Sequence, residues 1–359
     1  MTSAATSEDA FQDRMLQGVS RTFALTIPQL PGPLQPAIGN AYLLCRLADT
    51  IEDASGLDAS GKAAAFGLLE ASLAAPDRAT DLAAALAPEV DEADPAEREL
   101  VHEAERVVGR FHALPAAQQA PLRRCVTIMA RGMTRFEGLK SPVGLPDCAA
   151  FRDYCYYVAG VVGEMLTELF ACHDPAIAAQ RDRLRQQAVA FGQGLQMTNI
   201  LKDIWDDRAR GVCWLPRDLF ERHGITLEPG GDWHRHAGFR TAITELAGVA
   251  HGHLRVAHAY TRGIPREQRG IRRFCAWAIG MALYTLRNIA ADPGFRDSAA
   301  VKINRPRVRA VVLGGNLAVA HDRLLDCAFA WAARGLPAPG DRHPALNALS
   351  EETPWTQRP

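Results

Sequence analysis

Helical periodicity constrains the fold of this chain more than any other feature of its sequence. Apolar residues recur every three or four positions through nine long stretches, with polar residues between them. The stretches are 36–51, 63–73, 97–113, 122–139, 149–170, 182–206, 239–260, 267–289 and 307–334. Short segments containing Pro or Gly separate them, and no long alternation typical of a β-strand competes. The pattern predicts an all-α protein.

The length and charge of the chain narrow the possible classes of protein further. The 359 residues show no compositional break that would separate two cores, so we expect one helical domain at 19–335. A short N-terminal segment, 1–18, precedes it, and a polar, Pro-rich tail, 336–359, follows it. The formal net charge is -1 and no run of five basic residues occurs, which argues against a nucleic-acid-binding protein.

Several features concern the cellular location. The eight cysteines include no C-x-x-C pair, which is typical of reduced thiols in a cytoplasmic protein. The N-terminus is acidic and polar, unlike a signal peptide, and no uninterrupted apolar run reaches the roughly 18 residues of a membrane span. We therefore expect a cytoplasmic protein without a transmembrane segment, bound at most peripherally to the inner face of the membrane.

Two acidic clusters lie on predicted helices about 150 residues apart. The clusters are Asp49, Glu52 and Asp53, and Asp203, Asp206 and Asp207. In each, the carboxylates occupy positions i, i+3 and i+4, so they share one helix face and repel one another. One such cluster alone is usually a solvated acidic face. Two clusters that face each other suggest a cation site, and carboxylate oxygens suit magnesium that bridges a diphosphate.

Polar residues extend both clusters along their helices. Arg46 precedes Asp49 by three residues and Tyr42 lies one turn further back, within an otherwise apolar helix. Gln196 and Asn199 precede the second cluster on the same face. A surface helix does not need amides in this register, whereas the wall of a pocket that holds metals, waters and phosphate oxygens does.

Five sequence blocks, in this order, resemble the squalene and phytoene synthase family of head-to-head prenyltransferases. They are 20–24, 47–53, 154–163, 194–203, and 274–276 followed by 301–303. The first four are shared by the whole family, and the fifth favours its squalene-forming branch. The resemblance implies an isoprenoid synthase-type helical bundle with a central active-site cavity. It also implies Mg²⁺-dependent condensation of two farnesyl diphosphates to presqualene diphosphate, followed by NADPH-dependent rearrangement to squalene.

The resemblance assigns roles to individual residues. The implied magnesium ligands are Asp49, Glu52, Asp53, Asp203, Asp206 and Asp207, with Asp206 at a position where many members have glutamate. Tyr154 is the implied proton acceptor; Arg46, Asp49, Asp53, Asp203 and Asp207 complete the catalytic set. The implied substrate-binding residues are Ser20, Arg21, Phe23, Tyr42, Arg46, Val162, Gly163, Gln196, Asn199, Lys202 and Phe274. The implied NADPH-binding residues are Lys302 and Arg305.

Two groups of side chains suit the chemistry directly. Ser20, Arg21, Arg46 and Lys202 are candidates to bind phosphate oxygens. An allylic carbocation must be kept from water, and aromatic faces stabilise it without reacting. Phe23, Tyr42, Phe191 and Phe274 are candidates for that wall.

Some alternatives stay open at this point. Val212 stands where many family members have an arginine, so either Arg208 or Arg210 supplies that charge. Gly163 serves either close helix packing or access for the substrate. Asn304 replaces a basic residue of squalene synthases, with Arg305 displaced by one position.

The reaction could also end at presqualene diphosphate, dehydrosqualene or phytoene. A non-catalytic binding or assembly protein is the remote alternative, against which the intact carboxylates argue.

Overall fold

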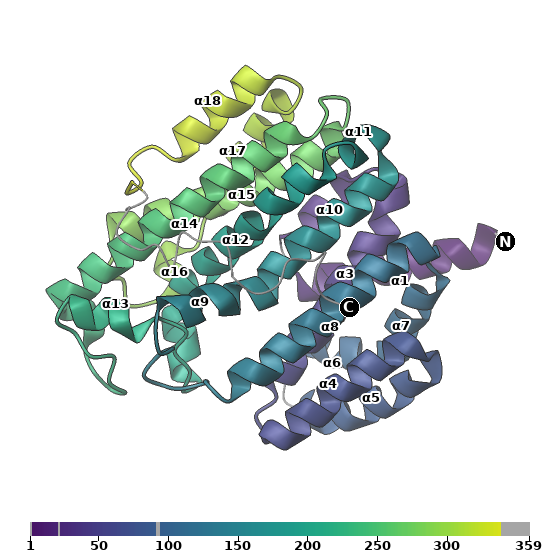
Figure 1. The fold of residues 1–359 in the computed structure, drawn as a ribbon, viewed down its shortest axis with the longest axis horizontal. Helices are drawn as coiled ribbons and strands as arrows, with labels where there is room; N and C mark the ends of the chain where they lie inside the picture. Colours follow the sequence, from purple (N-terminus) through teal and green to yellow (C-terminus); the bar gives the residue numbers. More distant parts are fainter. Residues whose placement is uncertain (1, 21, 91–93, 339–359) are drawn as a thin grey trace. The chain divides into compact units, whose positions relative to one another are not determined.

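The computed structural model describes residues 2–20, 22–90 and 94–338, and helices joined by short non-helical segments run through all of them (Figure 1). They divide into two compact units, one within Met1–Gly138 and Met165–Ala179, the other within Leu139–Glu164 and Gln180–Pro359. No β-strand occurs among the described residues; the β-type pairing seen there is an isolated bridge between Leu145 and Pro216. The predicted all-α class is confirmed, and the predicted domain bounds stay a prediction.

The first unit is built from helices of widely different length. They are α1 (Thr2–Val19), α2 (Phe23–Thr26), α3 (Gln35–Asp53), α4 (Ala59–Ala74), α5 (Ala79–Leu86), α6 (Pro95–His102), α7 (Ala104–Ala113), α8 (Ala116–Glu137), α11 (Pro175–Ala178) and most of α10 (Val161–His173). Single 3-10 turns lie at Ile27–Gln29, Gly32–Leu34, Pro76–Arg78 and Ala87–Val90.

Helix α3 lies in the core of this unit and positions the first acidic cluster. Leu44, Leu47 and Ile51 are fully buried on it, and it packs against α1, α7 and α8. The buried Asn40 donates a 2.8 Å hydrogen bond to the carbonyl of Val107 on α7. Because the helix is fixed on several sides, the side chains of its last turns have a defined setting.

A buried lysine holds the C-terminal end of α3. Lys62 of α4 donates to the backbone carbonyl of Glu52 at 2.8 Å and to the carboxylate of Glu137 at 2.9 Å. The last four carbonyls of a helix have no partner within the helix, so this bond satisfies a group that would otherwise need water. It fixes the backbone that carries Glu52 and Asp53.

The second unit contains the longest helices of the described chain. They are α9 (Cys148–Cys155), a π-helical turn (Tyr156–Gly160), the first turn of α10, α12 (Arg181–Ala209), α13 (Arg217–Arg222), a 3-10 turn (Trp233–Arg235), α14 (Ala237–Gly263), α15 (Arg269–Ala291), α16 (Ser298–Val301), α17 (Arg305–Ala318) and α18 (Asp322–Ala332). Helices α12, α14 and α15 pack on one another and form its core.

Glycines allow α12 to approach the segment around the π-helical turn. A Cβ atom on Gly163 would lie 2.1 Å from the carbonyl oxygen of Ala188, and one on Gly192 would lie 2.0 Å from that of Ala159. Neither contact tolerates a side chain, because the neighbour in each case is backbone. Gly163 is therefore required for helix packing in this unit.

The nine predicted stretches all lie on helices, but two of them are interrupted. The stretch 97–113 breaks at Glu103, whose backbone angles (φ -96°, ψ 14°) lie outside the helical region, between α6 and α7. The stretch 307–334 breaks before α18, where His321 is extended (φ -134°, ψ 116°). The helices that were not among the predicted stretches are α1, α2, α5, α11, α13 and α16.

Among the residues that the structure describes, one continuous helical stretch meets the length and composition of a membrane span. It runs over Cys148–His173 with a mean hydropathy of 1.2, and 61% of its most apolar window is buried within the protein. The core helix of a globular protein has the same properties, because its faces are covered by other helices.

Candidate functional site

In the first unit, the first acidic cluster lies in the last turns of α3 beside a guanidinium group. Arg46 lies 3.6 Å from the carboxylate of Asp49 and 3.3 Å from that of Glu97, which belongs to α6. Thr50 donates a 2.8 Å hydrogen bond to the same Glu97 carboxylate. Glu97 therefore holds Arg46 in place next to Asp49, a role that the sequence did not indicate.

The carboxyl group of Asp49 is strongly perturbed. Burial raises its pKa to about 7; Arg46 opposes this rise, and the nearby negative charges of Asp53 and Glu97 add to it. The side chain is still 43% exposed, so it lies in a recess that water reaches. Burial and the neighbouring carboxylates thus outweigh the attraction of Arg46, so ionisation of Asp49 is disfavoured. A cation would supply further positive charge.

We expect Asp49→Asn to stabilise the metal-free protein at about pH 8 and much less at about pH 4.5. The folded-state pKa lies above the unfolded value, so folding is penalised by ionisation above about pH 7. This penalty fades as the pH falls toward the unfolded pKa of Asp49. Because the side chain is 43% exposed, we expect a gain of only about 1 kcal/mol at the higher pH.

Thermal unfolding in a chelator at the two pH values measures this difference. Asp182→Asn is the matched control, because Asp182 is an exposed aspartate whose partner is Arg185 of its own helix. That variant should change the melting temperature equally little at both pH values. If Asp49→Asn stabilises the protein equally at both pH values, the ionisation of Asp49 is not the cause of the stabilisation.

Two aromatic rings and a hydroxyl group lie close to the start of α3 in the same unit. Phe23 and Tyr42 have ring centroids 5.0 Å apart, and the Tyr42 hydroxyl donates to the carbonyl of Val19 at 3.3 Å. The hydroxyl of Ser20 accepts a 2.9 Å bond from the backbone N–H of Phe23. These three predicted substrate-binding residues are thus neighbours, while Arg21 lies outside the described residues.

In the second unit, the second acidic cluster occupies the end of α12, and each of its carboxylates lies near a basic side chain. Lys202 contacts Asp203 at 3.0 Å and donates to the amide oxygen of Asn199 at 3.3 Å. Arg210 lies 2.6 Å from Asp207, and Lys302 lies 3.6 Å from Asp206. Predicted metal, substrate and cofactor residues therefore meet at one end of α12.

The structure distinguishes the two arginines that the sequence left open. Arg210 donates to the carboxylate of Asp207. Arg208 instead donates to the carbonyl of Gly231 at 2.7 Å and lies 4.0 Å from the centre of the Trp233 ring. Arg210 is consequently the arginine that lies at the acidic cluster, and Arg208 packs against the loop that precedes α14.

Tyr154 is buried on α9 and stacks on an aromatic ring that the sequence analysis did not single out. Its ring lies 3.9 Å from that of Trp214, at an interplanar angle of 10°. Trp214 follows the second acidic cluster, next to the Leu145–Pro216 bridge. The stacking fixes the plane of the Tyr154 ring. The available signal was Trp214 itself, which stands in Cys213-Trp214-Leu215-Pro216 a few residues after the cluster.

The other predicted residues of this unit lie on four helices. Gln196 is half-buried on α12, Val162 is half-buried on α10 beside Gly163, and Phe274 is buried on α15. Phe191 is buried on α12 and its ring lies 5.7 Å from that of Tyr260. Arg305 is exposed at the start of α17, three residues after Lys302.

The donor chemistry of both clusters fits magnesium. Within the described residues, no three His, Cys, Asp or Glu side chains already surround one point in the manner of a closed metal site. Magnesium does not require such a cage, since it is commonly bound by one or two carboxylates together with waters and substrate phosphates. Asp49, Asp203 and Asp207 supply such carboxylates, and each lies beside a basic group.

The chain belongs to the squalene/phytoene synthase family, whose model matches residues 16–307. It is 26% identical over 291 residues to the squalene synthase of Candida albicans, covering 78% of this chain and 61% of that protein. It is 30% identical over 285 residues to a squalene synthase of Botryococcus braunii, covering 77% and 57%. This chain thus spans about three fifths of the length of the curated relatives that it matches.

The fold agrees with this membership. A solved structure of TcSQS in complex with a ligand superposes with a TM-score of 0.73 at 21% identity, covering 96% of each chain. An identity this low supports the fold alone. The expected isoprenoid synthase-type helical fold is therefore confirmed, while the reaction requires an argument from the residues.

Proposed function

We propose that this protein is a squalene synthase. It would join two farnesyl diphosphates into presqualene diphosphate, releasing one diphosphate and one proton. It would then reduce presqualene diphosphate with NADPH to squalene, releasing the second diphosphate and NADP⁺. The observation that carries the proposal is that both acidic clusters are intact and that each has basic side chains beside it. Family membership and the block at 301–303 add support.

The residues of the first unit suit the binding and ionisation of a diphosphate. Asp49, Glu52 and Asp53 would hold magnesium, which when bound neutralises the diphosphate and makes it a better leaving group. Arg46 lies next to Asp49, so its guanidinium is placed to bind phosphate oxygens. Phe23 and Tyr42 offer apolar ring surface that excludes water from a cationic chain.

The residues of the second unit suit the remaining steps. Asp203, Asp206 and Asp207 would hold magnesium, and Lys202 and Arg210 would bind phosphate oxygens. Tyr154 would receive the proton that is lost on cyclopropane closure, with a phosphate oxygen as the final acceptor. An unperturbed tyrosine has a pKa near 10, so it needs such a relay at neutral pH.

The basic side chains near the start of α17 suit the 2'-phosphate of NADPH. Lys302 and Arg305 lie three residues apart, and the sequence contains no G-x-G-x-x-G motif that would bind a dinucleotide in a Rossmann fold. NADPH supplies hydride when bound. Because Lys302 also contacts Asp206, we propose that it serves both the cofactor and the acidic cluster, whereas Arg305 serves the cofactor.

Incubation of the purified protein with farnesyl diphosphate and magnesium tests the proposal. We expect presqualene diphosphate to accumulate without NADPH and squalene to form with it, as measured by extraction and chromatography of the lipids. Omission of magnesium should abolish both products. Dehydrosqualene or presqualene diphosphate as the end product at saturating NADPH would replace squalene synthase with a non-reducing member of the family.

Arg305→Ala tests whether Arg305 acts in NADPH binding and not in the reaction of the diphosphates. We expect a higher KM for NADPH with an unchanged rate of presqualene diphosphate formation, because Arg305 is not among the residues in contact with the acidic clusters. Arg305→Lys, which keeps the charge, is the control and should restore most of the affinity. Equal loss of both half-reactions in Arg305→Ala would assign the residue to the fold or to the diphosphate site.

We also propose peripheral contact with the inner face of the membrane, since squalene is apolar and must leave the protein for a lipid phase.

A further inference from the structure

Helices α17 and α18 carry unusually exposed apolar side chains. Leu313 and Leu317 on α17 are 65% and 75% exposed, and Leu324 and Trp331 on α18 are 48% and 64% exposed. Among the described residues, the remaining exposed large apolar side chain is Val256 on α14, at 36%. The exposed apolar surface of the described chain is therefore concentrated on two neighbouring helices (Figure 1).

The exposed side chains lie on the outer side of helices that are already fixed on their inner side. Leu313 and Leu317 are four residues apart, and Leu324 and Trp331 are seven apart, so each pair shares one helix face. The buried residues on the opposite faces are Val311, Ala318, Leu325 and Ala332. The core of the unit is complete without the outer side chains.

The packing beneath the outer face is close. A Cβ atom on Gly315 of α17 would lie 2.6 Å from the ring of Trp277 on α15, and one on Gly280 would lie 2.8 Å from Val311. A mainly apolar groove of about 220 Å³ runs between α14, α15, α17 and α18, and Trp331 also lines it. Helix α17 is thus packed closely against α15.

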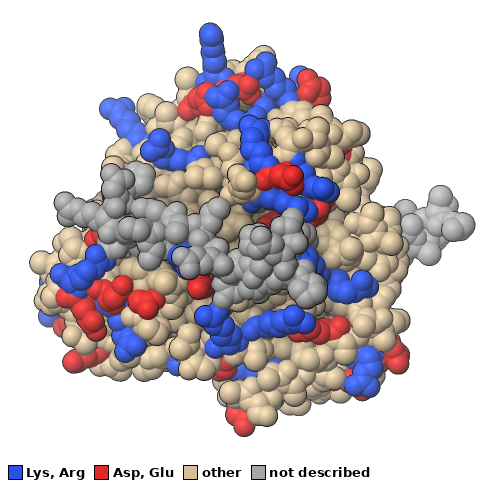
Figure 2. Space-filling view, viewed as in Figure 1, with Lys and Arg blue, Asp and Glu red and all other residues tan. Residues whose placement is uncertain are grey.

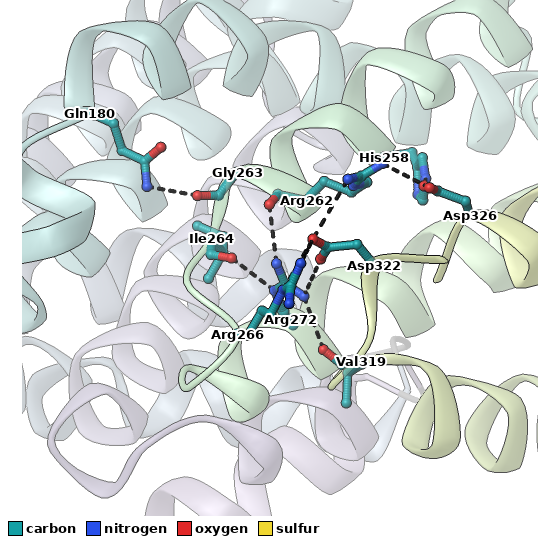
Figure 3. Close-up of polar contacts among 10 residues, drawn as sticks. All are labelled: Gln180, His258, Arg262, Gly263, Ile264, Arg266, Arg272, Val319, Asp322 and Asp326. Carbon is teal, nitrogen blue, oxygen red and sulfur yellow. Dashed lines mark hydrogen bonds and ion pairs between the residues drawn. The ribbon is translucent and has the colours of Figure 1, made fainter. Parts of the chain in front are cut away.

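The two acidic residues of α18 are engaged by basic residues of the unit (Figure 3). Asp322 accepts from the buried Arg272 at 2.9 Å and from Arg266 at 2.6 Å. Asp326 accepts from Arg262 at 2.7 Å and pairs with His258 at 2.8 Å. Arg272 also donates to three backbone carbonyls, those of Arg262, Ile264 and Val319.

This network leaves the exposed charge of α17 and α18 positive. Arg309, Arg323 and Arg334 are exposed. By helical register Arg309 and Arg323 share the outer side with the four apolar residues, and Arg334 lies in the turn that follows α18. Residues 246–334 contain fourteen Lys and Arg against five Asp and Glu, in a chain whose net charge is -1. Elsewhere, over much of the face drawn in Figure 2, basic and acidic side chains are intermixed.

We propose that this surface docks on an anionic lipid bilayer. We call it the α17–α18 face and define it by Leu313, Leu317, Leu324, Trp331, Arg309, Arg323 and Arg334. Leucine and tryptophan side chains enter the boundary between headgroups and acyl chains, while arginines bind lipid phosphates. The inference specifies the membrane contact of the proposed function, and its test needs no turnover.

Charge selects a bilayer as the occupant over a second copy of this chain. Two copies joined through the α17–α18 face would bring Arg309, Arg323 and Arg334 of each toward the same residues of the other, and like charges oppose such an association. An anionic bilayer supplies both a negative surface and an apolar interior, which are the two complements of this face.

Sedimentation of the full chain with lipid vesicles tests the proposal. We expect binding to phosphatidylcholine vesicles that contain about 30% phosphatidylglycerol, and weaker binding without the anionic lipid or at high salt. Arg309→Gln with Arg323→Gln should reduce the affinity about tenfold or more. Leu317→Ser with Trp331→Ser should reduce it comparably through loss of inserted apolar surface.

Val256→Ser is the matched control, because it removes an exposed apolar side chain outside the α17–α18 face. This variant should bind vesicles as the wild type does. Absence of vesicle binding, equal binding to neutral vesicles, or unchanged affinity in both double variants would overturn the proposal. So would a stable dimer that the Leu317→Ser and Trp331→Ser changes disrupt. Activity on farnesyl diphosphate in detergent, measured separately, reports on the proposed function alone.

Discussion

Replacing Asp49 or Asp207 with alanine is expected to reduce kcat/KM for farnesyl diphosphate by about a thousandfold or more. Each substitution removes a carboxylate proposed to hold magnesium. It also removes one acidic neighbour of an arginine, Arg46 or Arg210, and Arg46 keeps its contact with Glu97. The fold should be retained, since one carboxylate of a mutually repelling cluster is lost. Steady-state kinetics over a range of magnesium concentrations measures the effect.

Asp182→Ala provides the control for this experiment. Asp182 lies on the same helix as Asp207 but at its other end, with its side chain 86% exposed. Its pairing with Arg185 is a surface contact that contributes little to stability. We expect near-normal kinetics and circular dichroism from this variant. Near-normal activity in Asp49→Ala and Asp207→Ala as well would remove the acidic clusters from the mechanism.

The helices and the acidic clusters could be predicted from the sequence because both depend on local spacing. Carboxylates at i, i+3 and i+4 share a face on any α-helix, and α3 and α12 are helical through both clusters. The breaks at Glu103 and His321 could not be predicted in the same way. The apolar period continues across them, and backbone angles at single residues end the helices.

The partners of the predicted residues could not be predicted, because they are distant in sequence. Glu97 reaches Arg46 across 51 positions, and Lys302 reaches Asp206 from the segment between α16 and α17. The sequence contains no local signal for either contact, since tertiary packing alone brings these side chains together. Because Lys302 contacts Asp206, Arg305 is the cleaner probe of NADPH binding.

Tyr154→Phe is expected to abolish presqualene diphosphate and squalene formation without weakening the fold. The substitution removes one hydroxyl and keeps the ring that stacks on Trp214 at 3.9 Å. The stability of the protein should therefore change by no more than about 1–2 kcal/mol, the scale of one hydrogen bond. Product analysis after incubation with farnesyl diphosphate and magnesium, together with thermal unfolding, measures both quantities.

Tyr156→Phe makes the same chemical change two residues away, and it should lower the stability of the protein without abolishing product formation. The Tyr156 hydroxyl donates to the buried carboxylate of Glu164 at 3.1 Å, so its loss leaves a buried acceptor without that donor and lowers stability. We assign it no part in proton removal, and presqualene diphosphate should still form. If Tyr154→Phe instead makes both products at the wild-type rate, Tyr154 is a core tyrosine whose role is to stack on Trp214. Another group must then accept the proton, and a diphosphate oxygen is the alternative acceptor.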